Sequence, residues 1–252
     1  MTTQKALYQY TLRMGDDALI LSQRLSEWCS NAPFIEEDLA LTNFALDMIG
    51  RAQVLLKYAA DIEGQGKTED TLAFRRSERQ YYNHLLVEQP NGDFACTIAR
   101  QLYISAFEKL FFTELMKSKD ETLAALAAKI IKEVRYQLAH AEDWAIRLGN
   151  GTGESRYRMQ AALNSLWPYT GELFETDAVD VAMVQEGIGV DNKQLQAAWK
   201  EYTCTVIDKA NLEMPADGYM HTGSKKGIHT EHLGHLLCEM QYLQRAYPEA
   251  QW

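Results

Sequence analysis

Four carboxylates lie in otherwise apolar stretches of helical spacing: Asp16, Asp47, Glu108 and Glu133. Carboxylates on facing helices can bridge two metal ions and neutralise their charge, so a di-metal centre is the first chemistry to consider. In such centres two helices each supply one carboxylate, and the other two each supply a carboxylate followed three residues later by histidine. This spacing puts both ligands on one face of a helix.

The positions three residues after the second and fourth carboxylates do not hold histidine. They hold Gly50 after Asp47 and Tyr136 after Glu133. Glycine has no ligand atom, and a phenol is a poor ligand at neutral pH. Asp47 is also one carbon shorter than glutamate. The sequence therefore disfavours an oxygen-activating di-iron centre, and we expect neither a metal nor a catalytic residue in this chain.

Other polar residues near these acids favour a different arrangement, in which the positions of a di-metal site form a hydrogen-bonded core. Arg51 follows Asp47 by one helical turn, and Gln137 and His140 follow Glu133 by one and two turns. A buried carboxylate needs a cation or hydrogen-bond donors around it. A polar core network is the favoured interpretation, and a fully solvated helix face is the alternative.

A second candidate metal site lies near the C-terminus, where His229, His232 and His235 precede Glu239. Successive residues of this set drift around a helix, so only His232 with His235, or His235 with Glu239, share a face. The HExxH pattern of metalloproteases is absent. The favoured interpretation is a helix start capped by Thr230, with the polar side chains packing or facing water.

Nucleotide and nucleophile motifs are missing, because the chain has no GxSxG, P-loop or GxGxxG pattern. The four cysteines are widely scattered, as in a protein with reduced thiols. A small basic loop holds Lys225 and Lys226. It could contact a phosphate or an acidic partner, but a solvated surface loop is the commoner outcome.

Composition narrows the class of protein. The 252 residues carry a net charge of −10 and are 46% hydrophobic. An acidic surface disfavours nucleic-acid binding and a polybasic membrane anchor. We find no secretory signal and no apolar run of roughly 18 residues that would span a membrane, so we expect a cytoplasmic protein without a membrane partner.

The elements that would position these residues are helices, because apolar residues recur at helical rather than strand spacing. Four long helices are expected at about residues 6–30, 36–63, 93–116 and 120–148. Short helices are expected around 71–76 and 78–87. Further helices are expected at about 154–175, 178–187, 191–211 and 229–246, and Pro168 should kink the first of these.

Two antiparallel hairpins of long helices are typical of a four-helix bundle. The sequence therefore predicts an all-α fold in a single domain over residues 1–252. Its core bundle would cover about residues 6–150, with the additional helices at about 154–246.

Four stretches together resemble a known family: residues 12–54, 70–103, 132–152 and 223–244. They begin with LRMGDDALILSQRLSEW, DTLAFRRSERQYYNHLLVEQPNGDF, KEVRYQLAHAEDWAIRLGN and GSKKGIHTEHLGHLL. The chain resembles the C subunits of bacterial ring-1,2-phenylacetyl-CoA epoxidases, the multicomponent oxygenases of phenylacetate catabolism. The resemblance spans almost the whole chain.

The resemblance implies a ferritin-like fold and a structural, non-catalytic role beside a homologous A subunit that carries the di-iron centre. It also implies a small B subunit and a reductase that uses NADPH, flavin and an iron–sulfur cluster. No cofactor is expected in this chain, and the isolated chain could self-associate. The alternative function is a stand-alone metalloenzyme that uses the embedded carboxylates or the C-terminal histidines.

Overall fold

The computed structural model describes residues 2–250 of the chain. These residues form ten α-helices and four short 3-10 helices, and no strand is found among them. The predicted all-α class is therefore confirmed. Residues 1, 251 and 252, at the ends of the predicted domain, lie outside the described residues.

The helices gather into two compact units. The first contains residues 1–90 together with 223–252, and the second contains residues 91–222. The chain thus leaves the first unit once and returns to it for its last helix. The single domain over residues 1–252 stays a prediction.

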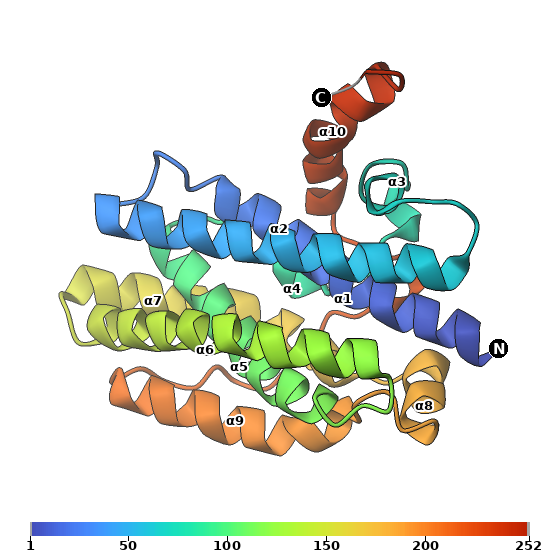
Figure 1. Ribbon diagram of the computed structural model, residues 1–252. Coiled ribbons are helices and arrows are strands. Elements are labelled where there is room, and N and C mark those ends of the chain that lie inside the picture. The colour runs from blue at the N-terminus through green and yellow to red at the C-terminus, as the bar shows by residue number, and fades with distance from the viewer. Residues whose placement is uncertain (1, 251–252) are drawn as a thin grey trace. The chain divides into compact units, whose positions relative to one another are not determined.

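The first unit is built on a long hairpin of α1 (Thr3–Ser26) and α2 (Ile35–Glu63), whose helices pack side by side (Figure 1). Three short elements follow: α3 (Glu69–Phe74), η1 (Glu78–Gln80) and α4 (Leu85–Glu88). The C-terminal segment adds η4 (Ser224–Lys226) and α10 (Glu231–Ala246). The last helix packs on α3 and η1, and α4 packs on α1.

Local signals explain where the hairpin helices begin and end. The Thr2 hydroxyl accepts a hydrogen bond from the backbone N–H of Lys5 and caps α1. Three acids in the first turn of α2 favour its N-terminus through the helix dipole. Gly64 ends α2 with a backbone φ of 68°, a left-handed conformation that suits glycine.

The second unit is organised around α5 (Phe94–Leu115), which packs against α6 (Glu121–Gly149), α7 (Gly153–Leu166) and α9 (Asn192–Lys209). Two 3-10 turns, η2 (Trp167–Tyr169) and η3 (Gly171–Phe174), precede α8 (Ala178–Gln185). Asp93 and Asp120 cap the N-termini of α5 and α6 through their side chains. These caps set the start of the second long hairpin.

Aromatic side chains fill the centre of this unit. Trp167 and Trp199 stack with ring centroids 5.7 Å apart, and both rings contact Tyr103. The Trp199 indole N–H donates to the backbone oxygen of Tyr103 at 3.0 Å. Burial in this cluster raises the pKa of Tyr103 well above its usual value.

Several elements differ from the sequence prediction. The short helix expected at residues 78–87 is two separate elements, η1 and α4, and residues 81–84 between them are not helical. The helix expected at residues 154–175 ends at Leu166 and continues as two 3-10 turns, because Pro168 has no backbone N–H to extend the helical ladder. The first helix ends at Ser26 rather than near residue 30, and a series of turns follows it.

One helix of the described residues, α2, is long and apolar enough by length and composition to cross a membrane, whereas the sequence had predicted none. The 18-residue stretch of this helix that meets the criterion is 44% buried inside the protein. A core helix that is mostly buried satisfies the same criterion. Length and composition therefore do not separate a spanning helix from one that packs against α1.

Candidate functional site

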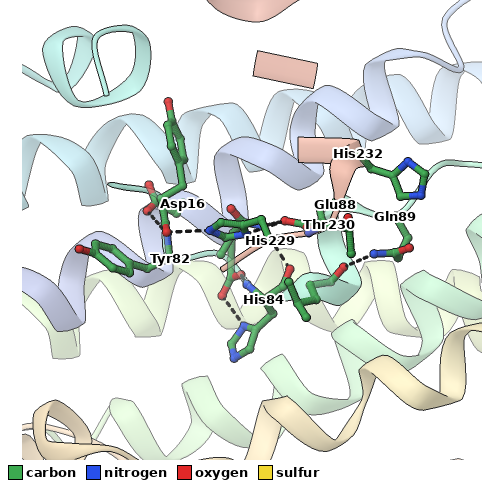
Figure 2. Close-up of polar contacts among 12 residues, drawn as sticks. Asp16, Tyr82, His84, Glu88, Gln89, His229, Thr230 and His232 are labelled. Atoms are coloured by element: carbon green, nitrogen blue, oxygen red, sulfur yellow. Dashed lines mark hydrogen bonds and ion pairs between the residues drawn. The ribbon is translucent and has the colours of Figure 1, made fainter. Parts of the chain in front are cut away.

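A buried cluster of acids and histidines lies in the first unit, where α4 meets the segment that leads into α10 (Figure 2). Its centre is Glu88, the last residue of α4, which is fully buried. Its carboxylate accepts hydrogen bonds from the Asn83 amide at 2.9 Å, and from the Thr230 backbone N–H at 2.7 Å and hydroxyl at 2.8 Å. The Nδ1 atom of His229 lies 2.8 Å from the same carboxylate.

Both ring nitrogens of His229 have partners in the core. The ring is fully buried, and its Nε2 lies 2.8 Å from the backbone oxygen of Tyr81. A carbonyl oxygen can only accept, so Nε2 carries a proton and donates to it. Nδ1 shares its hydrogen bond with the Glu88 carboxyl group. His229 and Glu88 thus form a buried hydrogen-bonded pair that joins α4 to the segment leading into α10.

Arg24 of α1 fixes the same region from the other side. Its guanidinium donates to the Glu88 backbone oxygen at 3.0 and 2.8 Å, and to the His232 backbone oxygen at 3.4 Å. It also pairs with Glu27 at 2.7 Å. One side chain of α1 is therefore bonded to backbone oxygens of both α4 and α10.

A second ion pair joins Asp16, nearer the N-terminus of α1, to Arg76. Two guanidinium nitrogens bind the two carboxylate oxygens, and the Tyr82 backbone N–H adds a bond of 3.0 Å. Burial raises the pKa of Asp16, and the Arg76 guanidinium opposes this increase. Every oxygen of this carboxylate is thus engaged within the protein.

The next residue of α1 makes a similar contact. Asp17 accepts from the His84 backbone N–H at 2.7 Å, and its other oxygen lies 2.8 Å from the His84 ring. Gln241 of α10 donates to the Tyr81 hydroxyl at 2.8 Å and to the backbone oxygens of Ala73 and Arg76. These polar contacts hold the segment before α4 between α1 and α10.

The predicted di-metal positions are divided between the two units. In the first unit, Asp47 is half-buried and Arg51 buried on α2, while Gly50 is exposed with open space where a Cβ would lie. In the second unit, Glu108 and Gln137 are buried, Glu133 and His140 are half-buried, and Tyr136 is 63% exposed. A network that joins all of them stays a prediction.

The C-terminal histidines do not act together. His229 points into the core, His232 is half-buried, and His235 and Glu239 are exposed on α10. Across residues 2–250, no three side chains of the metal-ligand types converge on one point. Thr230 does lie at the N-cap position of α10, but its hydroxyl bonds to Glu88 instead of capping the helix, which corrects the expected cap.

The basic loop forms η4 and packs on η1. Gly227 has a backbone φ of 67°, and a Cβ there would lie 2.2 Å from the Arg79 backbone oxygen. The loop is therefore part of the folded unit, with Lys226 exposed and Lys225 half-buried.

Sequence reasoning missed Glu88, Arg24 and Arg76. A usable signal existed at Glu88, which ends the apolar run Leu85-Leu86-Val87. A charge in such a run must find a partner if the run is buried. The partner itself, His229, lies 141 residues away and has no local signature.

A sequence model of the family described as phenylacetic acid catabolic protein matches residues 1–252. The chain belongs to this family. It is also similar to the C subunit of the 1,2-phenylacetyl-CoA epoxidase of Escherichia coli (strain K12), with 55% identity over 246 residues that cover 98% of this chain and 99% of the relative. The family is ferritin-like, which confirms the predicted fold class, and the resemblance drawn from the sequence is confirmed as well.

Proposed function

We propose that this protein is a structural, non-catalytic subunit of a multicomponent epoxidase that acts on phenylacetyl-CoA in the cytoplasm. It would support a separate catalytic subunit that carries the di-iron centre. The similarity to the C subunit of an epoxidase, along almost the full length of both chains, supports membership of such a complex.

The donor set carries the non-catalytic part of the proposal. A ferritin-like di-metal site needs free carboxylates and two histidines. Here both oxygens of Asp16 are bonded to Arg76, and one of them also accepts from the Tyr82 N–H. Gly50 offers no ligand atom, and Tyr136 is exposed. These residues do not fit a di-metal centre, and no reaction step is assigned to them.

The proposed partners are the catalytic A subunit, a small B subunit, and a reductase that passes electrons from NADPH through flavin and an iron–sulfur cluster. In this arrangement the chain itself binds no cofactor. Its contribution is to pack against the catalytic subunit and stabilise the helices that hold the metal.

Metal content per polypeptide tests this proposal. We expect near-zero iron in the purified chain, and iron with NADPH-dependent turnover only when the chain is co-expressed with the A subunit, the B subunit and the reductase. A Gly50→His/Tyr136→His variant should also purify without iron, because Asp16 stays bound to Arg76. About two irons per isolated wild-type chain would overturn the proposal and favour a stand-alone metalloenzyme.

A further inference from the structure

The outer face of α2 carries a stripe of exposed apolar side chains, which we call the α2 stripe. It consists of Ile35, Leu39, Leu46 and Ile49, with exposed fractions of 73%, 60%, 61% and 45%. Phe34, just before the helix, is 60% exposed as well. Single exposed apolar residues are ordinary on protein surfaces, but a contiguous set on one helix usually marks an interaction site.

The stripe has the geometry of a helix-packing surface. At about 100° per residue, its four side chains fall within an arc of about 80°. Thr42 lies between the two pairs, so the positions follow alternating steps of four and three residues, the spacing of a helix seam. Gly50 adjoins the stripe with open space at its Cβ position, which leaves room for a neighbouring helix to approach.

The stripe ends abruptly within the same helix. Further along α2, the exposed positions on this side are Gln53, Lys57 and Asp61. The opposite face of α2 is different again, because Leu41, Phe44 and Met48 are fully buried in the protein. The first half of the outer face is therefore specifically apolar, while the second half is an ordinary solvated surface.

The charges beside the stripe determine which occupant it suits. At about 100° per residue, Asp38 lies directly beside one edge, and Glu36 and the half-buried Asp47 lie about 60–80° beyond the other. In a parallel pair of two copies, opposite edges would meet, so Asp38 of one copy would face the edge that carries Glu36 in the other. In an antiparallel pair, the acidic first turn of one copy would face Asp47 of the other. Like charges in direct opposition disfavour association, and the chain as a whole carries a net charge of −10. Anionic lipid would be repelled in the same way.

We infer that the α2 stripe is a docking surface for a helix of a different polypeptide, one with an apolar face bordered by lysine or arginine. The inference rests on the proposed function, because the catalytic subunit of the complex is then the partner that presents this helix. The apolar centre supplies the buried contact, and the acidic edges set the orientation and speed the encounter.

Binding of the purified chain to the purified catalytic subunit tests this surface. We expect Leu39→Glu/Leu46→Glu to weaken the dissociation constant by roughly 30-fold or more, since central apolar anchors dominate such interfaces. The matched control is Val181→Glu/Val184→Glu on α8, which makes the same change at exposed valines elsewhere and should leave the affinity within about twofold. Circular dichroism and thermal unfolding should match the wild type for both variants.

The acidic edges have their own test. Asp38→Lys/Asp47→Lys should lower the association rate by about tenfold and reduce its dependence on salt, while changing the dissociation rate less. An unchanged association rate would overturn the proposed basic partner surface, even if the apolar variant behaves as expected.

The outcomes separate the surface from the function. If the wild type binds the catalytic subunit and the Leu39→Glu/Leu46→Glu variant binds equally well, the docking surface is wrong and the proposed function stands. If the wild type does not bind the catalytic subunit at all, the proposed function is wrong and the inference falls with it. If the stripe variant instead abolishes a dimer of the isolated chain, or binding to anionic vesicles, without affecting the catalytic subunit, a second copy or a membrane is the occupant and the inference is overturned.

Discussion

At the scale of single residues, the most constrained group is the Glu88 carboxylate. It accepts from Asn83 and from both donors of Thr230, and it shares a hydrogen bond with the His229 ring, all within the core of the first unit. Such a buried polar contact adds little net stability compared with apolar packing, but removing one partner is costly because the others stay buried without their hydrogen bond. The contact between Glu88 and His229 therefore mainly determines that α4 packs against the segment leading into α10.

Removal of this carboxylate gives the first prediction. Glu88→Ala should lower the free energy of unfolding by about 3–5 kcal/mol, because it leaves the His229 ring and both donors of Thr230 buried without their hydrogen-bond partner. Urea unfolding measures the change. The control is Glu239→Ala, an exposed acid on α10 that should alter stability by less than about 0.5 kcal/mol. Equal effects in the two variants would contradict the assigned pair.

A second residue-scale prediction concerns Glu142 in the second unit. Tyr202 donates to its carboxylate at 2.6 Å and Lys209 at 3.2 Å. Burial raises the pKa of Glu142, but these two donors outweigh burial and the pKa is lowered overall. A lowered pKa in the folded state stabilises the protein above the unfolded-state value of 4.5, and this stabilisation is lost as the pH falls through the folded-state pKa.

The unfolding temperature as a function of pH measures this effect. The difference between the wild type and Glu142→Gln should be largest near pH 7 and should shrink as the solution is acidified below 4.5. Tyr202→Phe should remove part of the same pH dependence because it removes one donor. A difference that stays constant down to low pH would contradict the assigned role of Tyr202 and Lys209.

At the scale of elements, the distance from a glycine to the neighbouring backbone decides whether a larger residue can replace it. Gly149 ends α6 against the end of α9, and a Cβ there would lie 2.2 Å from the Ala210 backbone oxygen. Gly50 lies inside α2 with nothing within 4 Å of its Cβ position. The first glycine permits two helices to touch, whereas the second contacts nothing within the chain itself and there lowers helix propensity.

The same substitution at these two glycines should therefore have opposite effects. Gly149→Ala should destabilise the protein by about 1–3 kcal/mol, because α6 and α9 must move apart. Gly50→Ala should stabilise it by about 0.5–1 kcal/mol through helix propensity. Calorimetric unfolding temperatures of both variants give the signs. Destabilisation by Gly50→Ala would mean that another surface covers this part of α2.

At the scale of the whole molecule, the chain forms two compact units, and the segment from Gly223 onward returns to the first. The return is held by polar contacts, namely His229 and Thr230 to Glu88, and Gln241 to the segment around Tyr81. The C-terminal segment is thus an integral part of the first unit rather than an appended tail.

Hydrogen exchange can test this organisation. In His229→Ala, we expect faster amide exchange in peptides from residues 1–90 and 223–252, because Glu88 and the Tyr81 backbone oxygen lose a buried hydrogen-bond partner. Peptides from residues 91–222 should keep the wild-type rates. Tyr157→Ala, an exposed position on α7, is the control and should leave both units unchanged. Equal loss of protection in both units would show that they do not open separately.

The sequence by itself determined where most helices lie and that two of the expected metal-ligand positions lack histidine. Caps and stops act within about four residues, so Asp93, Asp120 and Gly64 could be located without a structure. The absence of histidine at positions 50 and 136 needs no coordinates either, because a residue type alone decides whether a ligand atom exists. Pro168 was recognised as a break, although its effect was an end to the helix rather than a kink.

Only the tertiary structure decided which faces are covered and which distant groups meet. Leu46 and Ile49 fit the apolar periodicity of a core helix, yet they are exposed, because periodicity defines a face but not what packs on it. The pairing of Glu88 with His229 joins residues that are 141 positions apart. No local rule reaches that far, since such contacts depend on how α4 and α10 dock, which is set by packing over the whole unit.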